Sequence, residues 1–413
     1  MTVDQPPIGR PLLRLGARAA TVAGSYLVTA VTVLIAIVVM RAMVSPSLLR
    51  DALSFFFIAT LAAGLEPATV KAAVLGGEGG PAVPGAGMGA YLCASVIKAL
   101  AASPFLAALW AFSDPKIDLT CLVWTPLVTV AGFVATDLRV LFDVRGRHAL
   151  AIWLKQGSLM VGLLSLCALL LAGAPLFWAI GVSTALRLCL IAAFPLMPQA
   201  GGAAAPLWRA VRRLLGDSRW MELAGASVIA ASSGSMDRIL ALRYLAPGTY
   251  SGYYLLYEVF SKFWLLPYLL GPIIFARRAA GQQADQFIRG AWRFTLLAGL
   301  CFVALVGGIV VWAPAVVDRV VGASFGPLIV VFAVAIVAGA FTQLRIADLQ
   351  GSGATRRATI LIAFGAVVSA VAFFGFIRNM GADGLFWAWL VKSVVELVAT
   401  LVAGGGLVGR KRV

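Results

Sequence analysis

Long apolar runs separated by short polar segments are the dominant pattern along this chain. Each run has roughly the 20 residues that an α-helix needs to cross a bilayer core, and none alternates as a strand does. The pattern therefore predicts an all-α polytopic membrane protein with about twelve spans. The predicted spans are 20–43, 52–75, 87–112, 119–141, 149–172, 176–197, 221–245, 250–275, 292–313, 324–347, 357–377 and 384–406.

The longest predicted connection divides these spans into two sets of six. We expect an N-terminal six-helix bundle over 1–197, a basic cytoplasmic connector over 198–219 and a C-terminal six-helix bundle over 220–413. An even number of spans gives both halves the same orientation, with pseudo-two-fold symmetry along the membrane normal. Similar sequences, Thr136-Asp137-Leu138-Arg139 and Thr342-Gln343-Leu344-Arg345, end the fourth and tenth predicted spans and hint at duplication.

The composition supports a membrane protein and gives its orientation. The chain is 61% hydrophobic and 12% charged, which is far too apolar for a soluble domain. Its net charge of +16 does not indicate a nucleic-acid partner, because the basic residues lie in short segments between apolar runs. The predicted outer loops hold few of them, namely Arg41, Arg50, Lys116, Arg319 and Arg378. The positive-inside rule then predicts that both termini are cytoplasmic.

The predicted hairpin over 232–267 carries charges at membrane depth. Asp237 and Arg238 lie in the seventh span, and Glu258 and Lys262 lie in the eighth. A charge facing lipid at the bilayer centre costs about 3 kcal/mol or more, so these side chains should face one another or a wet cavity. Helical rise puts them at similar depths, which allows Arg238–Glu258 or Asp237–Lys262 pairing across the hairpin. Glu258 and Lys262 can also pair along one helix.

Other charged residues lie inside predicted spans, and basic ones dominate the mid-membrane set. A cationic cavity favours an anionic substrate, such as a phosphate or diphosphate. The candidate substrate-binding residues are Arg238, Lys262, Lys98, Arg187, Lys392, Asp237 and Glu258. The alternative is that these charges form buried pairs that fix helix register, or reach the membrane interface. Nearby Tyr250, Tyr253, Tyr254 and Tyr257 are interpreted as an interfacial belt, or alternatively as a surface on which sugar rings stack.

Specific motifs resemble a known family. Met236-Asp237-Arg238-Ile239-Leu240, Gly252-Tyr253-Tyr254 and the junction Leu138–Asp143 are similar to polysaccharide-type flippases. These belong to the multidrug/oligosaccharidyl-lipid/polysaccharide (MOP) exporter superfamily. The resemblance implies a central cavity between two bundles. It also implies alternating access that carries a lipid-linked saccharide of the undecaprenyl-diphosphate type to the outer leaflet, for surface polysaccharide synthesis.

The resemblance also has limits. Drug-exporting relatives often have an acidic residue in the first span, and this chain has none between Thr21 and Met40. Cation coupling would therefore have to use Glu66, Asp237, Glu258 or Glu396. A small-molecule or drug exporter of the same superfamily is the alternative. A membrane polymerase or ligase is a weaker one, because the predicted outer loops are short and the sole histidine, His148, lies on the inner side. We expect no catalytic residues, cofactor or metal, and partners limited to the anionic lipid-linked saccharide, membrane lipids and other polysaccharide-assembly proteins.

Overall fold

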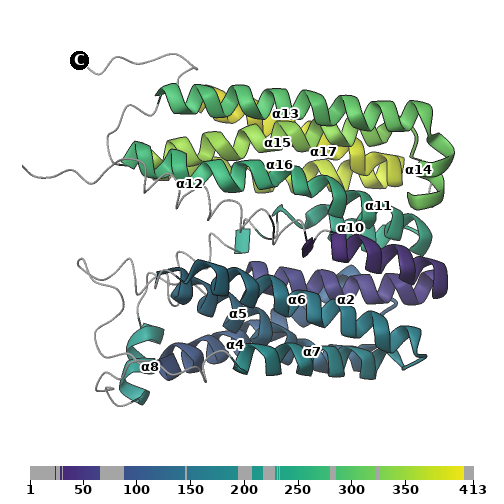
Figure 1. Ribbon diagram of the computed structural model, residues 1–413, viewed down its shortest axis with the longest axis vertical. Coiled ribbons are helices and arrows are strands. Elements are labelled where there is room, and N and C mark those ends of the chain that lie inside the picture. The colour runs from purple at the N-terminus through teal and green to yellow at the C-terminus, as the bar shows by residue number, and fades with distance from the viewer. Residues whose placement is uncertain are drawn as a thin grey trace, which may run out of the picture.

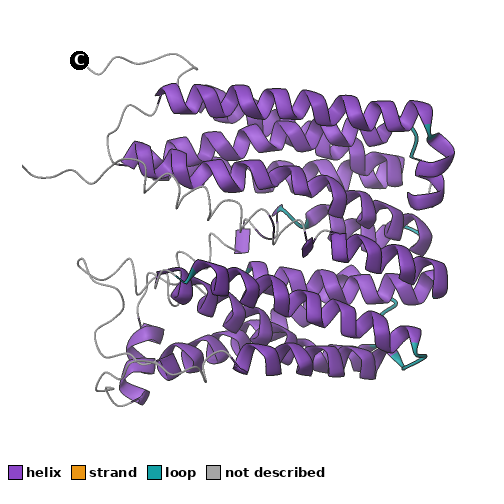
Figure 2. Ribbon diagram, in the orientation of Figure 1, coloured by secondary structure: helices purple, strands orange, loops and turns teal. Residues whose placement is uncertain are grey.

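The computed structural model describes residues 24, 28–29, 31–65, 88–144, 147–193, 207–216, 228–229, 231, 233–279, 285–321 and 325–403. All regular structure in this described part is helical, as Figure 2 shows. Ten helical segments within it are long and apolar enough to span a membrane, and a shorter apolar helix covers Val31–Met43. The chain is therefore a multi-pass membrane protein, as its sequence predicts.

The helices of the first half are the helix Val31–Met43, α2 (Pro46–Gly64), α4 (Met88–Ser113), the 3-10 helix η1 (Leu119–Trp124), α5 (Thr125–Val144), α6 (His148–Leu171), α7 (Leu176–Ala193) and α8 (Leu207–Gly216). The helices of the second half are α10 (Met236–Tyr244), α11 (Pro247–Phe260), the 3-10 helix η2 (Ser261–Trp264), α12 (Leu265–Ala279), α13 (Asp285–Trp312), α14 (Pro314–Val321), α15 (Leu328–Gly351), α16 (Thr355–Met380) and α17 (Ala382–Ala403). These two sets are called the first and second halves below.

The two halves lie side by side, with their long helices running in one common direction (Figure 1). They meet where α2 packs against α11 and where α10 packs against α4 and α2. One end of the molecule carries α8, and the opposite end carries α14 (Figure 1). These ends are called the α8 end and the α14 end. The predicted bundle boundaries and six spans per bundle stay predictions, because the chain on both sides of α8 lies outside the described residues.

Most predicted spans match a helix to within a few residues, and α2 is an exception. We predicted a span over 52–75, with Arg50 in an outer loop, whereas the helix begins at Pro46 and Arg50 lies inside it. The Ser45 side chain caps this helix by accepting a hydrogen bond from the Leu48 amide, and proline suits the first helical position. The prediction that Arg50 lies in an outer loop was therefore wrong, because Arg50 is a helical residue that is only 3% exposed.

The eighth predicted span is one continuous helical segment that contains a 3-10 turn. It begins at Pro247, as α11, and passes through the single 3-10 turn η2 into α12. The tyrosines of α11 are buried in the protein, and Tyr253 packs against Phe332 and Phe386 of the second half. The interpretation of these tyrosines as an interfacial belt was therefore wrong. Their rings form part of the core that holds α11 against α15 and α17.

Candidate functional site

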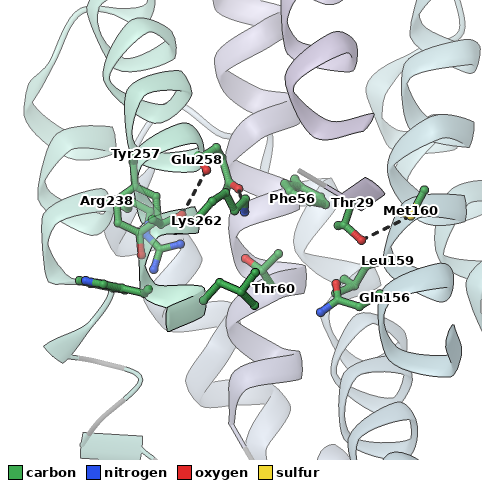
Figure 3. A pocket seen from close by; sticks show the side chains of 13 residues that line it. Thr29, Phe56, Thr60, Gln156, Leu159, Met160, Arg238, Tyr257, Glu258 and Lys262 are labelled. Carbon is green, nitrogen blue, oxygen red and sulfur yellow. Dashed lines mark hydrogen bonds and ion pairs between the residues drawn. The ribbon is translucent and has the colours of Figure 1, made fainter. Parts of the chain in front are cut away.

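A cavity of about 460 Å³ lies between the two halves, near the middle of the molecule. One wall comes from the second half, through α10, α11, η2 and the start of α12. The opposite wall comes from α6 and from Thr29, and α2 lies between them (Figure 3). The lining residues are Thr29, Phe56, Thr60, Gln156, Leu159, Met160, Arg238, Tyr257, Glu258, Ser261, Lys262, Trp264 and Leu265.

Arg238 is held rigidly on the second-half wall. One of its terminal nitrogens donates to the Gly234 carbonyl at 3.0 Å and to the Ser235 hydroxyl at 2.9 Å. Its guanidinium carbon lies 4.3 Å from the centre of the Tyr257 ring and 5.1 Å from that of Phe57. Phe57 belongs to α2, so this cation contacts aromatic rings of both halves. Stacking and hydrogen bonding leave the planar group little freedom, which favours bidentate binding of an oxyanion.

Glu258 and Lys262 form the second charged feature of this wall. Their side chains pair at 2.9 Å across one helical turn, which confirms the predicted pairing along the helix. The 3-10 turn η2 begins three residues after Glu258, and it contributes Ser261, Lys262 and Trp264 to the cavity lining. The charged residues of the lining are thus two cations and one carboxylate. A second carboxylate, that of Asp237, lies 3.8 Å from the Arg238 guanidinium just behind the lining, so the four charges balance.

Asp237 is buried behind this wall and does not line the cavity. Its carboxylate accepts hydrogen bonds from the Tyr253 hydroxyl at 2.6 Å and from the Trp389 indole nitrogen at 3.3 Å. The other carboxylate oxygen lies 3.8 Å from the Arg238 guanidinium. We had considered an ion pair between Asp237 and Lys262. Instead, Lys262 pairs with Glu258, and Asp237 lies beside Arg238. Asp237 therefore supports Arg238 from behind and anchors α10 to α11 and α17.

The remaining predicted cations lie elsewhere. Lys98 and Arg187 are buried in α4 and α7 of the first half, and neither lines the cavity. Lys392 pairs with Glu396 at 3.5 Å on α17 and lies over the Trp389 ring, also away from the lining. Glu66, an ion-coupling candidate, lies outside the described residues. The cations that line the described cavity are thus Arg238 and Lys262, and each has a carboxylate beside it, Asp237 and Glu258 respectively.

The first-half wall carries neutral polar groups that sequence reasoning missed. Gln156 and Thr60 line the cavity opposite the cations, together with the Thr29 hydroxyl, which contacts the Met160 sulfur at 3.5 Å (Figure 3). An amide and two hydroxyls both donate and accept hydrogen bonds, as sugar hydroxyls do. No charge marked these residues in the sequence. Only their place in the cavity lining distinguishes them, on α2 for Thr60, on α6 for Gln156, and at Thr29.

Comparison with known proteins identifies the fold. No protein-family profile matches the chain, and no curated protein matches it by sequence. Among solved structures, a mutant of the Vibrio cholerae MATE transporter VcmN matches with a TM-score of 0.62 at 14% identity, covering 94% of this chain and 96% of that one. The lipid II flippase MurJ, in an inward closed conformation, matches with a TM-score of 0.59 at 11% identity, covering 93% and 87%.

A MOP superfamily transporter from Pyrococcus furiosus, described as having a binding pocket of reversed polarity, is similar in the same way. Its TM-score is 0.59 at 15% identity, and the match covers 97% of both chains. At these identities the likeness establishes the fold of MOP superfamily transporters, over almost the whole chain. It confirms the predicted fold class and leaves the substrate to be argued from the cavity.

Proposed function

We propose that this protein is a transporter that moves an anionic, lipid-linked saccharide between membrane leaflets by alternating access. The substrate would be of the undecaprenyl-diphosphate type, carried to the outer leaflet of a bacterial plasma membrane for surface polysaccharide synthesis. In this orientation the α8 end is cytoplasmic, as the positive-inside rule predicts. The fold shared with transporters and with a lipid flippase supports the proposal.

The unequal chemistry of the two cavity walls is the observation that carries this proposal. Arg238 and Lys262 stand on one wall, where they can bind phosphate oxygens. Gln156, Thr60 and Thr29 stand opposite, where they can bind hydroxyls. Tyr257 and Trp264 add aromatic faces on which a sugar ring can stack. A ligand with a diphosphate at one end and a sugar at the other matches both walls at once.

A second candidate function is export of a small organic cation. Two similar structures are described as multidrug resistance MATE family transporters. Glu258 and the aromatic lining of the cavity would suit a flat cationic compound. What favours an anionic ligand is which groups reach the cavity, because two cations and one carboxylate line it while Asp237 is buried behind them. Measuring efflux of a cationic dye from cells separates the two functions, since the flippase proposal predicts no protein-dependent efflux.

Neutralising the cationic wall tests the proposal in cells. Arg238→Gln and Lys262→Gln should each abolish surface polysaccharide and cause lipid-linked precursor to accumulate, because the phosphate loses its charged donors. Arg356→Gln, an exposed arginine on α16, is the control and should leave output unchanged. Immunoblots of membranes confirm equal protein levels. Normal polysaccharide output from both cavity variants would contradict the proposal.

A further inference from the structure

Three arginines join the two halves at the α14 end, each in the same way. Arg41, at the end of the helix Val31–Met43, donates to the Val320 carbonyl at 2.9 Å and also to the Val321 carbonyl. Arg50 of α2 donates to the Leu242 carbonyl at 2.6 Å. Arg243 of α10 donates to the Phe112 carbonyl at 2.5 Å, with its guanidinium carbon 4.4 Å from the centre of the Phe112 ring.

Every one of these acceptors lies in the last turn of a helix. Leu242 is in the last turn of α10, Phe112 in that of α4, and Val320 and Val321 end α14. The last four carbonyls of a helix have no partner within it, and they lie at the negative end of its dipole. An arginine from the opposite half therefore caps each helix end and neutralises its partial charge. The capping is reciprocal, because each half supplies arginines to the other.

Arg50 is the buried centre of this arrangement. Besides Leu242 it binds the Asp114 carboxylate at 2.9 Å, and both side chains are nearly inaccessible. Asp114 follows α4 in the first half, so this ion pair stays intact when the halves separate. The pair keeps the guanidinium charge neutralised and aimed at the interface. When the two halves separate, Arg50 loses its hydrogen bond to the Leu242 carbonyl and keeps its ion pair with Asp114. The contact between the halves can therefore break and form again without leaving the Arg50 charge unpaired.

The position of these contacts relative to the cavity gives them a role. Along α2, Arg50 precedes the cavity residues Phe56 and Thr60 by about 9 and 15 Å of helical rise. The arginines therefore stand between the cavity and the α14 end. At the α8 end, in contrast, Arg278 binds Asp285 at 2.7 Å and Asp348 at 2.6 Å, and all three belong to the second half.

We propose that Arg41, Arg50 and Arg243 form an arginine latch that closes the cavity at the α14 end by capping helix ends across the two halves. Opening toward that end breaks the three cross-half contacts and leaves the Arg50–Asp114 pair in place. The inference rests on the alternating access of the proposed function, and it holds for any substrate. The latch arginines would act by holding the two halves together and not by binding substrate, because none of them lines the described cavity.

Site-directed labelling tests the latch without any substrate. Thr60→Cys, in a background with the five native cysteines replaced by alanine, supplies a target in the cavity. A membrane-impermeant maleimide is applied to right-side-out and to inverted membrane vesicles. With the latch intact, labelling should be fast from the α8 side and slow from the α14 side. The triple variant Arg41→Gln, Arg50→Gln and Arg243→Gln should raise the rate from the α14 side about tenfold or more, given the strength of charge-assisted bonds.

The control is Arg378→Gln, which should leave both labelling rates unchanged. Arg378 is an exposed arginine in the last turn of α16 and is not one of the latch residues. If the triple variant does not fold, the double variant Arg41→Gln with Arg243→Gln retains the buried Arg50–Asp114 pair and is read in the same way. An unchanged ratio of the two labelling rates in a folded latch variant would overturn the proposal. That result would leave the substrate assignment standing, because labelling involves no transport.

Discussion

At the scale of single residues, the carboxylate of Asp237 shows how a charge is held inside the second half. It receives neutral donors from Tyr253 and Trp389, and the Trp389 indole nitrogen also lies 2.9 Å from the Tyr253 hydroxyl. These three groups join α10, α11 and α17 in one buried network. In such a network, removing one donor leaves a charged acceptor under-satisfied in a low-dielectric surrounding. Asp237 therefore contributes to stability and to the orientation of Arg238.

Tyr253→Phe tests this network. The variant loses the 2.6 Å hydrogen bond to Asp237 and should lower the stability of the protein by about 1–3 kcal/mol, the cost of an unsatisfied buried group. Thermal unfolding in detergent, followed by size-exclusion chromatography after heating, measures the shift in the midpoint. Tyr244→Phe is the control, because Tyr244 is 52% exposed, and it should leave the midpoint unchanged. Equal midpoints for the two variants would contradict the role of the network.

Some of the residues that line the cavity could be predicted from the sequence. Arg238, Glu258 and Lys262 stood out because charge inside an apolar run needs a partner or a wet surface. Depth along a helix can be counted from the sequence, but the direction in which each side chain points cannot. For this reason Lys98, Arg187 and Lys392 looked equivalent to Arg238, although they face other surroundings. Gln156 lacked even the signal of charge.

At the scale of elements, the turn between α16 and α17 depends on a close backbone approach. Gly381 connects these helices with a φ of 60°, a left-handed conformation that glycine adopts readily. One turn later, a Cβ atom at Gly384 would lie 2.2 Å from the Phe376 carbonyl oxygen. That obstacle is backbone, so the helices would have to move apart. The buried ring of Trp389 depends on the same packing, as does its contact with Asp237.

Gly384→Ala should therefore destabilise the second half by about 1–3 kcal/mol, as overpacking does elsewhere. Gly375→Ala on the neighbouring helix is the matched control, because nothing lies within 4 Å of its added Cβ. Alanine in place of glycine in an open helical position is neutral or slightly stabilising. The thermal midpoint in detergent should fall for the first variant alone. A fall of the same size in both would contradict the close approach as its cause.

Helix existence could be predicted more securely than helix ends. Apolar runs of membrane length fix that a span is present, whereas local capping fixes where it begins. In α2, Arg50 resembled a loop residue, and the proline at 46 was the better signal of the helix start. The 3-10 turn η2 had a signal in Pro267, because a proline has no N–H to bond to the carbonyl four residues earlier, which here is that of Phe263 in η2.

At the scale of the whole molecule, the described residues hold the two halves together at the α14 end. The α14 end is held by arginines that cross the interface, and the cavity lies on the other side of them. Such an arrangement is a state closed at the α14 end, as alternating access requires of one of its two states. The substrate argument belongs to this scale as well, since the cationic wall and the neutral wall come from different halves. A rocking motion of the halves would change the distance between the two walls.

Translocation in a purified system tests the central claim most directly. The protein is reconstituted into liposomes that carry a fluorescent diphosphate-linked polyprenyl saccharide, and the label exposed on the outer leaflet is quantified over time. We predict that the protein moves the lipid across, and that Arg238→Gln and Lys262→Gln reduce the rate at least about tenfold, because each removes a charge-assisted contact. Equal rates for protein-containing and protein-free liposomes, or full rates in both variants, would contradict the account.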